Sequence, residues 1–100
     1  MAATTALEPG EQAQALVCGE YLANDGVAVL TDRRVVLANS RMFAPEIHSL
    51  SLRSIKDVKG WADSARATLR FSSDDGAFVI GDIKEVESAQ DFASAVRGKI

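Results

Sequence analysis

The chain has 100 residues, of which 47% are hydrophobic and 25% are charged, and it carries a net charge of −3. This composition fits one small globular domain and excludes an intrinsically disordered chain, which needs low hydrophobicity and a high net charge. No apolar run reaches the roughly 18 residues of a transmembrane helix. A mildly acidic chain is also a poor candidate for binding nucleic acid through bulk charge.

The start of the chain predicts no folded element. Residues 1–6 contain neither a basic region nor a continuous apolar run, so we interpret them as a flexible lead and not as a signal peptide. We expect residues 7–100 to form a single domain. The one cysteine, Cys18, cannot form an internal disulfide, which favours a cytoplasmic protein.

Three apolar segments in the first half predict a three-stranded meander. The first covers residues 13–22, and the Asn-Asp-Gly sequence at 24–26 is expected to turn the chain, because Asp-Gly favours a tight hairpin. The next two strands, over 26–31 and 34–39, are separated by a turn at Asp32-Arg33. Both are apolar on both phases, which predicts burial from two sides.

The second half predicts further strands and a second hairpin. Residues 47–52 alternate between apolar and polar side chains, and Ile55 and Val58 predict a short strand or bend that ends near Gly60-Trp61. The clearest alternation covers 66–72, where the apolar side chains are expected to point inward at every second position. An Asp-Asp-Gly turn at 74–76 returns the chain into a strand over 77–81.

From Asp82 onwards the apolar spacing changes to three and four residues, which predicts one amphipathic helix. Asp82 and Glu85 have the pattern of a capping box at its start, and Gly98 is a natural end. The apolar stripe is expected at Val86, Ala89, Ala93, Val96 and Ile100, with Phe92 flanking it. We therefore predict a mainly β fold, in which about seven antiparallel strands are closed by one C-terminal helix.

Four stretches of the sequence form a recognisable series. They are Leu7-Glu8-Pro9-Gly10-Glu11, the sequence GVAVLTDRRVVL over 26–37, His48-Ser49-Leu50-Ser51-Leu52 with Ile55, and Ala89-Gln90-Asp91-Phe92-Ala93 in the terminal helix. Together they resemble the bacterial PH-like domains, small relatives of the pleckstrin-homology fold, over residues 7–98. The resemblance implies a two-sheet β-roll or sandwich capped by an amphipathic α-helix.

The resemblance implies little about activity, since this fold hosts lipid binders, peptide binders and structural modules. Lipid-binding members usually carry several basic side chains around the first hairpin. The corresponding segment here, residues 23–26, carries an acid and no base, so no phosphoinositide site is carried over.

No motif for catalysis, a metal ion or a cofactor stands out. His48, the only histidine, has no Cys, Asp or Glu partners at ligand spacing, and Cys18 has no neighbouring base. The acidic turn at 74–76 lacks the ligand spacing and the terminal Glu of an EF-hand. We therefore predict a protein that is not an enzyme and that uses neither a metal nor a cofactor.

Six residues are candidates for an interaction surface: Arg41, Met42, Phe43, Trp61, Arg66 and Arg70. The loop at 41–45 places two large apolar side chains beside a base, which is typical of a membrane interface or a partner's pocket, unless Phe43 packs back into the barrel. Trp61 is either a binding anchor or a packed aromatic side chain. Arg66 and Arg70 share one face of the predicted strand, where nearby acids would form salt bridges with them.

Two functions from different classes follow. The leading hypothesis is a binding or scaffolding module that recognises a protein partner, or self-associates, through an open sheet edge or a groove beside the helix. The alternative is a peripheral module that binds an anionic membrane through the Arg41–Pro45 loop and the basic residues of the second half. An enzyme with a small-ligand pocket under the helix is a third reading.

Overall fold

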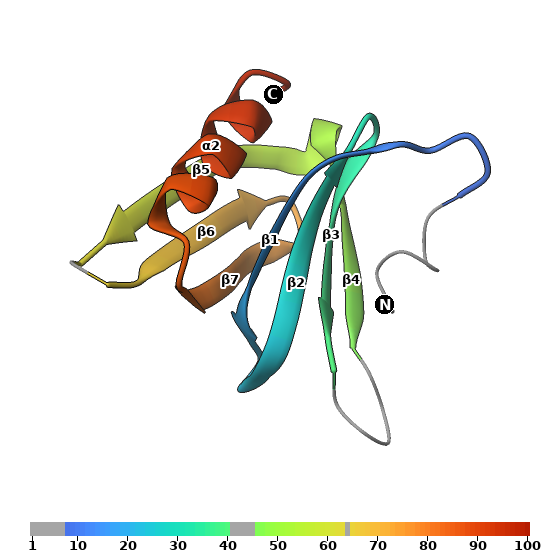
Figure 1. The fold of residues 1–100 in the computed structure, drawn as a ribbon. Coiled ribbons are helices and arrows are strands. Elements are labelled where there is room, and N and C mark those ends of the chain that lie inside the picture. Colours follow the sequence, from blue (N-terminus) through green and yellow to red (C-terminus); the bar gives the residue numbers. More distant parts are fainter. Residues whose placement is uncertain (1–7, 41–45, 64) are drawn as a thin grey trace.

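A computed structural model describes residues 8–40, 46–63 and 65–100. The predicted flexible lead at 1–6 and the loop residues Arg41, Met42 and Phe43 lie outside these ranges, so their expected roles stay predictions. Within the described ranges the chain forms a strongly bent antiparallel sheet with a helix packed beside it (Figure 1).

The strands are β1 (Ala13–Tyr21), β2 (Asn24–Thr31), β3 (Arg34–Asn39), β4 (Ile47–Ser51), β5 (Ile55–Ala62), β6 (Ala67–Ser73) and β7 (Gly76–Ile83); the 3-10 turn η1 (Leu52–Ser54) connects β4 to β5, and the helix is α2 (Val86–Arg97). Their order in the sheet is β4-β3-β2-β1-β7-β6-β5. We call β1–β4 the first ladder and β5–β7 the second ladder. They are joined where Glu20 of β1 pairs with Gly81 of β7. The predicted mainly β fold with a C-terminal helix is confirmed.

The joint between the two ladders depends on Gly19. A Cβ atom at this position would overlap the carbonyl oxygen of Gly81 and would lie 2.9 Å from Ile83 Cγ1. Only glycine therefore lets β1 approach β7 this closely. The ladders diverge from the joint, and α2 packs against β5, β1 and β6 between them (Figure 1).

The main hydrophobic core lies between the two ladders and α2. Phe71 of β6 and Phe92 of α2 pack edge to face in it, with ring centroids 6.1 Å apart. Ala67 and Leu69 are buried beside Phe71, as the alternation in β6 predicts. A second buried cluster, on the opposite face of β2 and β3, comprises Val27, Val29, Val36 and Ala38. The predicted two-sided burial of these strands is confirmed.

The first hairpin turns at Leu22-Ala23, so the turn predicted at 24–26 was wrong. Both turn residues have positive φ, 53° and 66°, the values of a type I′ hairpin. Gly26 is needed inside β2 for a different reason. A Cβ atom there would lie 2.6 Å from Tyr21 Cβ and 2.9 Å from the carbonyl oxygen of Ala38. This glycine makes room for a buried tyrosine and does not form the turn.

The helix starts later than predicted and has no capping box. It begins at Val86, and its N-cap residue, Glu85, makes no side-chain capping hydrogen bond. Asp82 still belongs to β7, where its carboxylate accepts a hydrogen bond from Arg66 Nε at 2.7 Å. The buried side chains of the helix are Ala89, Phe92, Ala93 and Val96, so Phe92 lies within the stripe, whereas Ile100 follows the helix and is exposed. Gly98 ends the helix as predicted.

Candidate functional site

The terminal strand β5 leaves backbone groups open on the side of α2. In an antiparallel ladder, the N–H and C=O groups of successive residues point to alternate sides. Val58 points its carbonyl away from β6, since this oxygen accepts hydrogen bonds from Arg97 Nε at 3.1 Å and Nη2 at 2.9 Å. Gly60 and Ala62 have the same phase, and their outward groups have no hydrogen-bond partner among residues 8–40, 46–63 and 65–100. This edge of the sheet is therefore open beyond Val58.

A groove of about 440 Å³ lies between this open edge and the helix. Gly60, Trp61 and Ala62 form the β5 wall, and Leu69 of β6 also lines the groove. The α2 wall consists of Ala89, Gln90, Ala93 and Ser94, with Arg97 at its C-terminal end. Because mostly small residues face each other, neither wall fills the space between strand and helix. We call this space the β5 groove.

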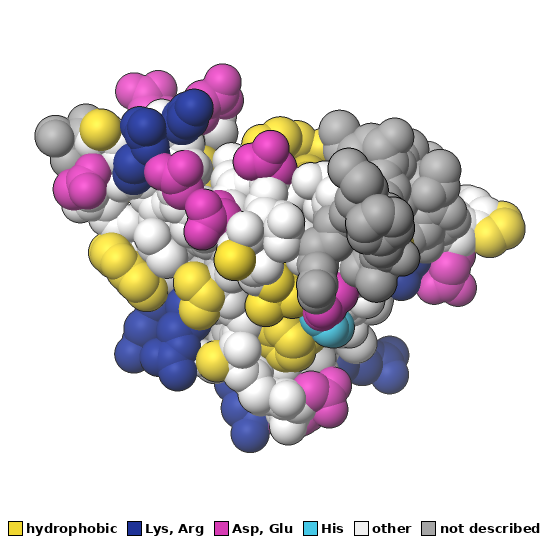
Figure 2. All heavy atoms as spheres, turned by 90° about the horizontal axis from the view of Figure 1, so that it is seen from below, with side chains coloured by type: hydrophobic (Ala, Val, Ile, Leu, Met, Phe, Trp, Pro, Cys, Tyr) yellow, Lys and Arg dark blue, Asp and Glu magenta, His cyan; other side chains and the backbone are white. Residues whose placement is uncertain are grey.

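Trp61 and Arg70 share the outer face of the second ladder, beside the β5 groove. Trp61 is 57% exposed, and Arg70 lies directly across from Lys59 of β5 and Val79 of β7. Directly opposite residues lie on one face of a sheet. We therefore call Lys59, Trp61, Arg70 and Val79 the Trp61 face. Seen from below, basic side chains lie beside hydrophobic ones on the side of the second ladder (Figure 2).

The Trp61 face carries an uncompensated pair of like charges. Neither Lys59 nor Arg70 forms a side-chain hydrogen bond or an ion pair with any described residue. Like charges directly opposite each other destabilise a sheet. No described contact offsets the repulsion between Lys59 and Arg70, so this pair does not stabilise the isolated domain.

Arg66, by contrast, is neutralised locally. It precedes β6, and its guanidinium donates to Asp82 Oδ1 at 2.7 Å and to the carbonyl of Ala65 at 3.1 Å. Asp63 accepts hydrogen bonds from the backbone N–H groups of Ala65 and Arg66, which lowers the pKa of the Asp63 carboxyl. Arg66 therefore has an acidic partner, whereas Arg70 has none among the described residues.

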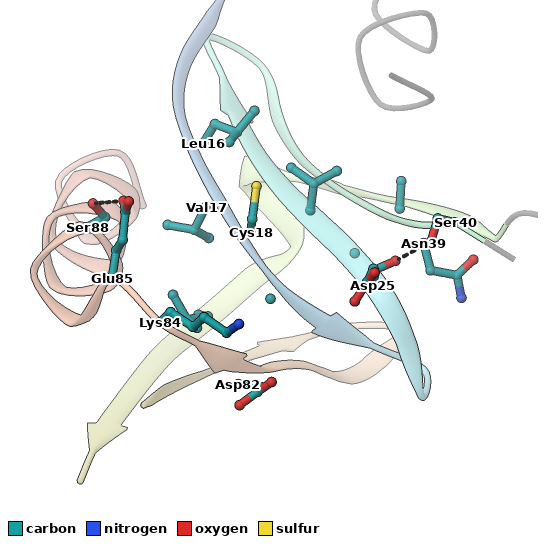
Figure 3. Close-up of a pocket in the computed structure, with 15 residues that line it drawn as sticks. Leu16, Val17, Cys18, Asp25, Asn39, Ser40, Asp82, Lys84, Glu85 and Ser88 are labelled. Atoms are coloured by element: carbon teal, nitrogen blue, oxygen red, sulfur yellow. Dashed lines mark hydrogen bonds between the residues drawn. The ribbon is translucent and has the colours of Figure 1, made fainter. Parts of the chain in front are cut away.

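A larger groove of about 670 Å³ lies where β1 leaves β7 (Figure 3). Its apolar lining includes Leu16, Cys18, Val27 and Ala38. Two pairs of its polar residues bond to each other: Ser88 Oγ donates to Glu85 at 3.1 Å, and the Ser40 N–H donates to the carbonyl of Asp25 at 2.9 Å. Lys84 reaches toward β1 at its rim (Figure 3). No buried, unpartnered polar side chain occurs in the part of the chain described.

The most buried charge stabilises the first ladder and was missed by sequence reasoning. The fully buried Glu11 carboxylate accepts from Arg34 Nε and Nη2, both at 2.8 Å, and from Thr31 Oγ1 at 2.7 Å. Hydrogen bonding from Arg34 lowers the pKa of Glu11 to about 2, against the opposing effect of burial. No local pattern links a carboxylate before β1 to an arginine 23 positions later.

His48 lies on the core side of β4, where it contacts Tyr21 and not a nucleophile. The Tyr21 hydroxyl lies 2.6 Å from His48 Nδ1, and burial raises the pKa of Tyr21 to about 12. Ser49 pairs with Val36 on the opposite face of the ladder, which leaves no Ser-His arrangement there. No three His, Cys, Asp or Glu residues of the described chain are grouped as a metal site, and no described helix has the length and apolarity to cross a bilayer.

A comparison with known protein families matches residues 7–98 to the family described as "Bacterial PH domain". The match spans all seven strands and the helix of the described structure. No curated protein and no solved structure matches the chain significantly.

Proposed function

The chain belongs to the bacterial PH domain family, and from this premise we propose that it is a non-catalytic module that binds an extended segment of a protein partner along β5. PH domains are generally non-catalytic and commonly mediate protein or lipid interactions. The observation that carries the proposal is the set of open backbone groups at Gly60 and Ala62 beside an unfilled groove.

Strand addition uses both features. An extended peptide that joins a sheet edge gains main-chain hydrogen bonds, and pockets for alternate side chains give it specificity. Exposed edges are normally blocked, because they invite unwanted pairing. On β5 the block consists of Arg97, which covers the carbonyl of Val58 but not those of Gly60 and Ala62.

Charge argues against self-association through this edge. Two copies paired along β5 with matching faces would bring two Lys59–Arg70 pairs onto one surface, and like charges repel. The other terminal strand, β4, carries no such pair, and its Ile47 is 44% exposed. If the chain forms a homo-oligomer, we expect β4 to be the strand that pairs.

An anionic membrane surface is the second candidate, and the Trp61 face is the observation that favours it. An exposed tryptophan beside two unpaired cations suits the boundary between lipid headgroups and apolar chains. This alternative predicts that the protein sediments with vesicles containing phosphatidylserine and that added salt weakens the effect.

The substitution Ala62→Pro tests strand addition directly. Proline removes an N–H group that points away from β6 and places a ring in the edge, while the ladder hydrogen bonds are retained. Ile47→Pro is the matched control: because Glu46 accepts from the N–H of Asn39, the N–H of Ile47 points away from β3. In selections from a random 12-residue peptide library, the wild type and Ile47→Pro should enrich the same peptides, and Ala62→Pro should enrich none. No enrichment by the wild type, or enrichment unaffected by Ala62→Pro, would refute strand binding along β5.

A further inference from the structure

Three cations near the open edge of β5 have no carboxylate partner among the described residues: Arg97 lines the β5 groove, and Lys59 and Arg70 lie on the outer face. Lys59 and Arg70 form no ion pair with a described residue, and Arg97 donates only to a backbone carbonyl. The exposed Asp57 lies on the same face as Lys59 but makes no ion pair with it. The Asp63 carboxylate already accepts two backbone hydrogen bonds.

The lack of partners at these cations does not reflect a shortage of acids on the second ladder. Lys56 pairs with Asp74 at 3.2 Å, and Arg66 pairs with Asp82 at 2.7 Å. Acidic residues therefore neutralise Lys56 and Arg66, the other two cations of the second ladder. Lys59 and Arg70, which lie directly across from each other, have no such partner among the described residues.

The phase of β5 fixes where the side chains of an added strand would lie. Gly60 points its backbone groups outward, so it would form the hydrogen-bonded pair with the new strand. The residues opposite Lys59 and Trp61 would then occupy the closer, non-hydrogen-bonded positions, with Cα atoms roughly 4.5 Å apart. Their side chains would meet the Trp61 face. The side chain between them, opposite Gly60, would point to the other side, into the β5 groove.

We propose that the bound segment is acidic, with a carboxylate opposite Lys59, an apolar side chain opposite Gly60 and a second apolar side chain opposite Trp61. This inference rests on the proposed function and adds the chemistry of the partner. The carboxylate would bind the paired cations Lys59 and Arg70, which relieves their repulsion. The first apolar side chain would enter the groove walled by small residues of α2, and the second would contact the exposed indole.

The test compares peptide pools selected by the wild type and by the double variant Lys59→Glu/Arg70→Glu. Both residues are exposed, so we expect the variant to fold. The wild-type pool should be enriched in acidic–apolar–apolar triplets, read in either direction. The variant's pool should carry Lys or Arg at the acidic position and keep the apolar ones. A wild-type peptide should bind the variant roughly tenfold more weakly.

A matched control separates local recognition from overall charge. Lys84→Glu/Lys99→Glu makes the same change in net charge at exposed residues that lie outside the three strands of the second ladder. This control should select the same peptides as the wild type. If its pool also switched to basic residues, the net charge of the chain would account for the preference and the inference would fail.

The outcomes distinguish this inference from the proposed function. Enrichment that Ala62→Pro abolishes but that shows no acidic position would overturn the inference and leave strand binding intact. Absence of any enrichment would overturn both. If vesicles containing phosphatidylserine sediment the wild type but not the Lys59→Glu/Arg70→Glu variant, and no peptide is enriched, the Trp61 face binds a membrane instead.

Discussion

The two ladders belong to one sheet, yet their outer faces differ in what they contribute. On the first ladder this face carries Val27, Val29, Val36 and Ala38, all of them buried. On the second ladder it carries Lys59, Trp61, Arg70 and Val79, all of them exposed. The first ladder is therefore stabilised by buried side chains on both of its faces. The outer face of the second ladder adds little stability, and exposed aromatic and charged side chains on a rigid strand are a common basis for binding.

The largest difference is expected between two arginines, one from each ladder. Arg34→Ala leaves the fully buried Glu11 carboxylate without its partner, so the free energy of unfolding should fall by about 3–5 kcal/mol. Arg70→Ala removes an exposed side chain that has no partner among the described residues and should change the free energy of unfolding by less than about 0.5 kcal/mol. Urea unfolding measures both. If both substitutions lowered the free energy of unfolding equally, the two ladders would not differ in how their arginines contribute to stability.

Acid should weaken the first ladder through the same ion pair. The pKa of Glu11 is about 2 in the folded chain and 4.5 ordinarily, so the folded state favours the charged form. The stabilisation is fully present above pH of about 5 and is lost as the pH falls toward 2. Unfolding followed between pH 7 and 3 should show this decline, and Glu11→Gln should flatten it. If Glu11→Gln still lost as much stability as the wild type between pH 7 and 3, other carboxylates would be responsible for the pH dependence.

A smaller difference in the free energy of unfolding is expected between Val36 and Val79, which lie on the outer faces of the first and second ladders. Val36 is fully buried, and Val36→Ala should cost about 2 kcal/mol through lost burial and the cavity that remains. Val79 is 42% exposed, and Val79→Ala should cost less than about 0.5 kcal/mol. The same unfolding experiment compares them, and a Val79→Ala loss as large as that of Val36→Ala would mean that the second outer face is also structural.

The smallest expected change has the opposite sign. Lys59→Glu replaces a like-charge pair with an opposite-charge pair across from Arg70, so the free protein should gain about 0.2–1 kcal/mol of stability. The same change should weaken binding of any acidic segment. Arg53→Glu, an exposed residue in η1 outside the ladders, is the control. A loss of stability in Lys59→Glu would show that Lys59 has a structural partner.

Sequence reasoning succeeded where one element determines its own pattern. The alternation in β6 predicted that Leu69 and Phe71 are buried, and the double-phase runs of β2 and β3 predicted burial from both sides. It failed where a residue is needed for contacts with another strand. Gly26 has the signature of a turn, but it is needed because a Cβ atom there would overlap Tyr21 of β1 and the carbonyl oxygen of Ala38 in β3.

The candidate site shows the same limit. Trp61 and Arg70 are candidates from the sequence, but the sequence leaves open whether Trp61 is packed and predicts salt bridges for Arg70; the exposure of both side chains appears only in the fold. The groove beside them could not be predicted, since it arises from small residues on β5 and α2 that meet only after folding. The contact of Arg97 with Val58, 39 positions apart, is equally invisible along the chain. Likewise, nothing local indicated that Arg66 would bind Asp82 while Arg70 has no ion-pair partner within residues 8–40, 46–63 and 65–100.

The glycine joint between the ladders has a consequence for how this domain can vary. The helix that walls the β5 groove follows directly from β7, and β7 takes its position where it meets β1 at Gly19. Any larger residue at Gly19 would act as a wedge that tilts β7, and the helix would be carried with it. The width of the β5 groove would thus depend on Gly19, a residue that lines neither of its walls. Substitutions in the walls of the β5 groove alone would therefore not make use of the change in groove width that a substitution at Gly19 would cause.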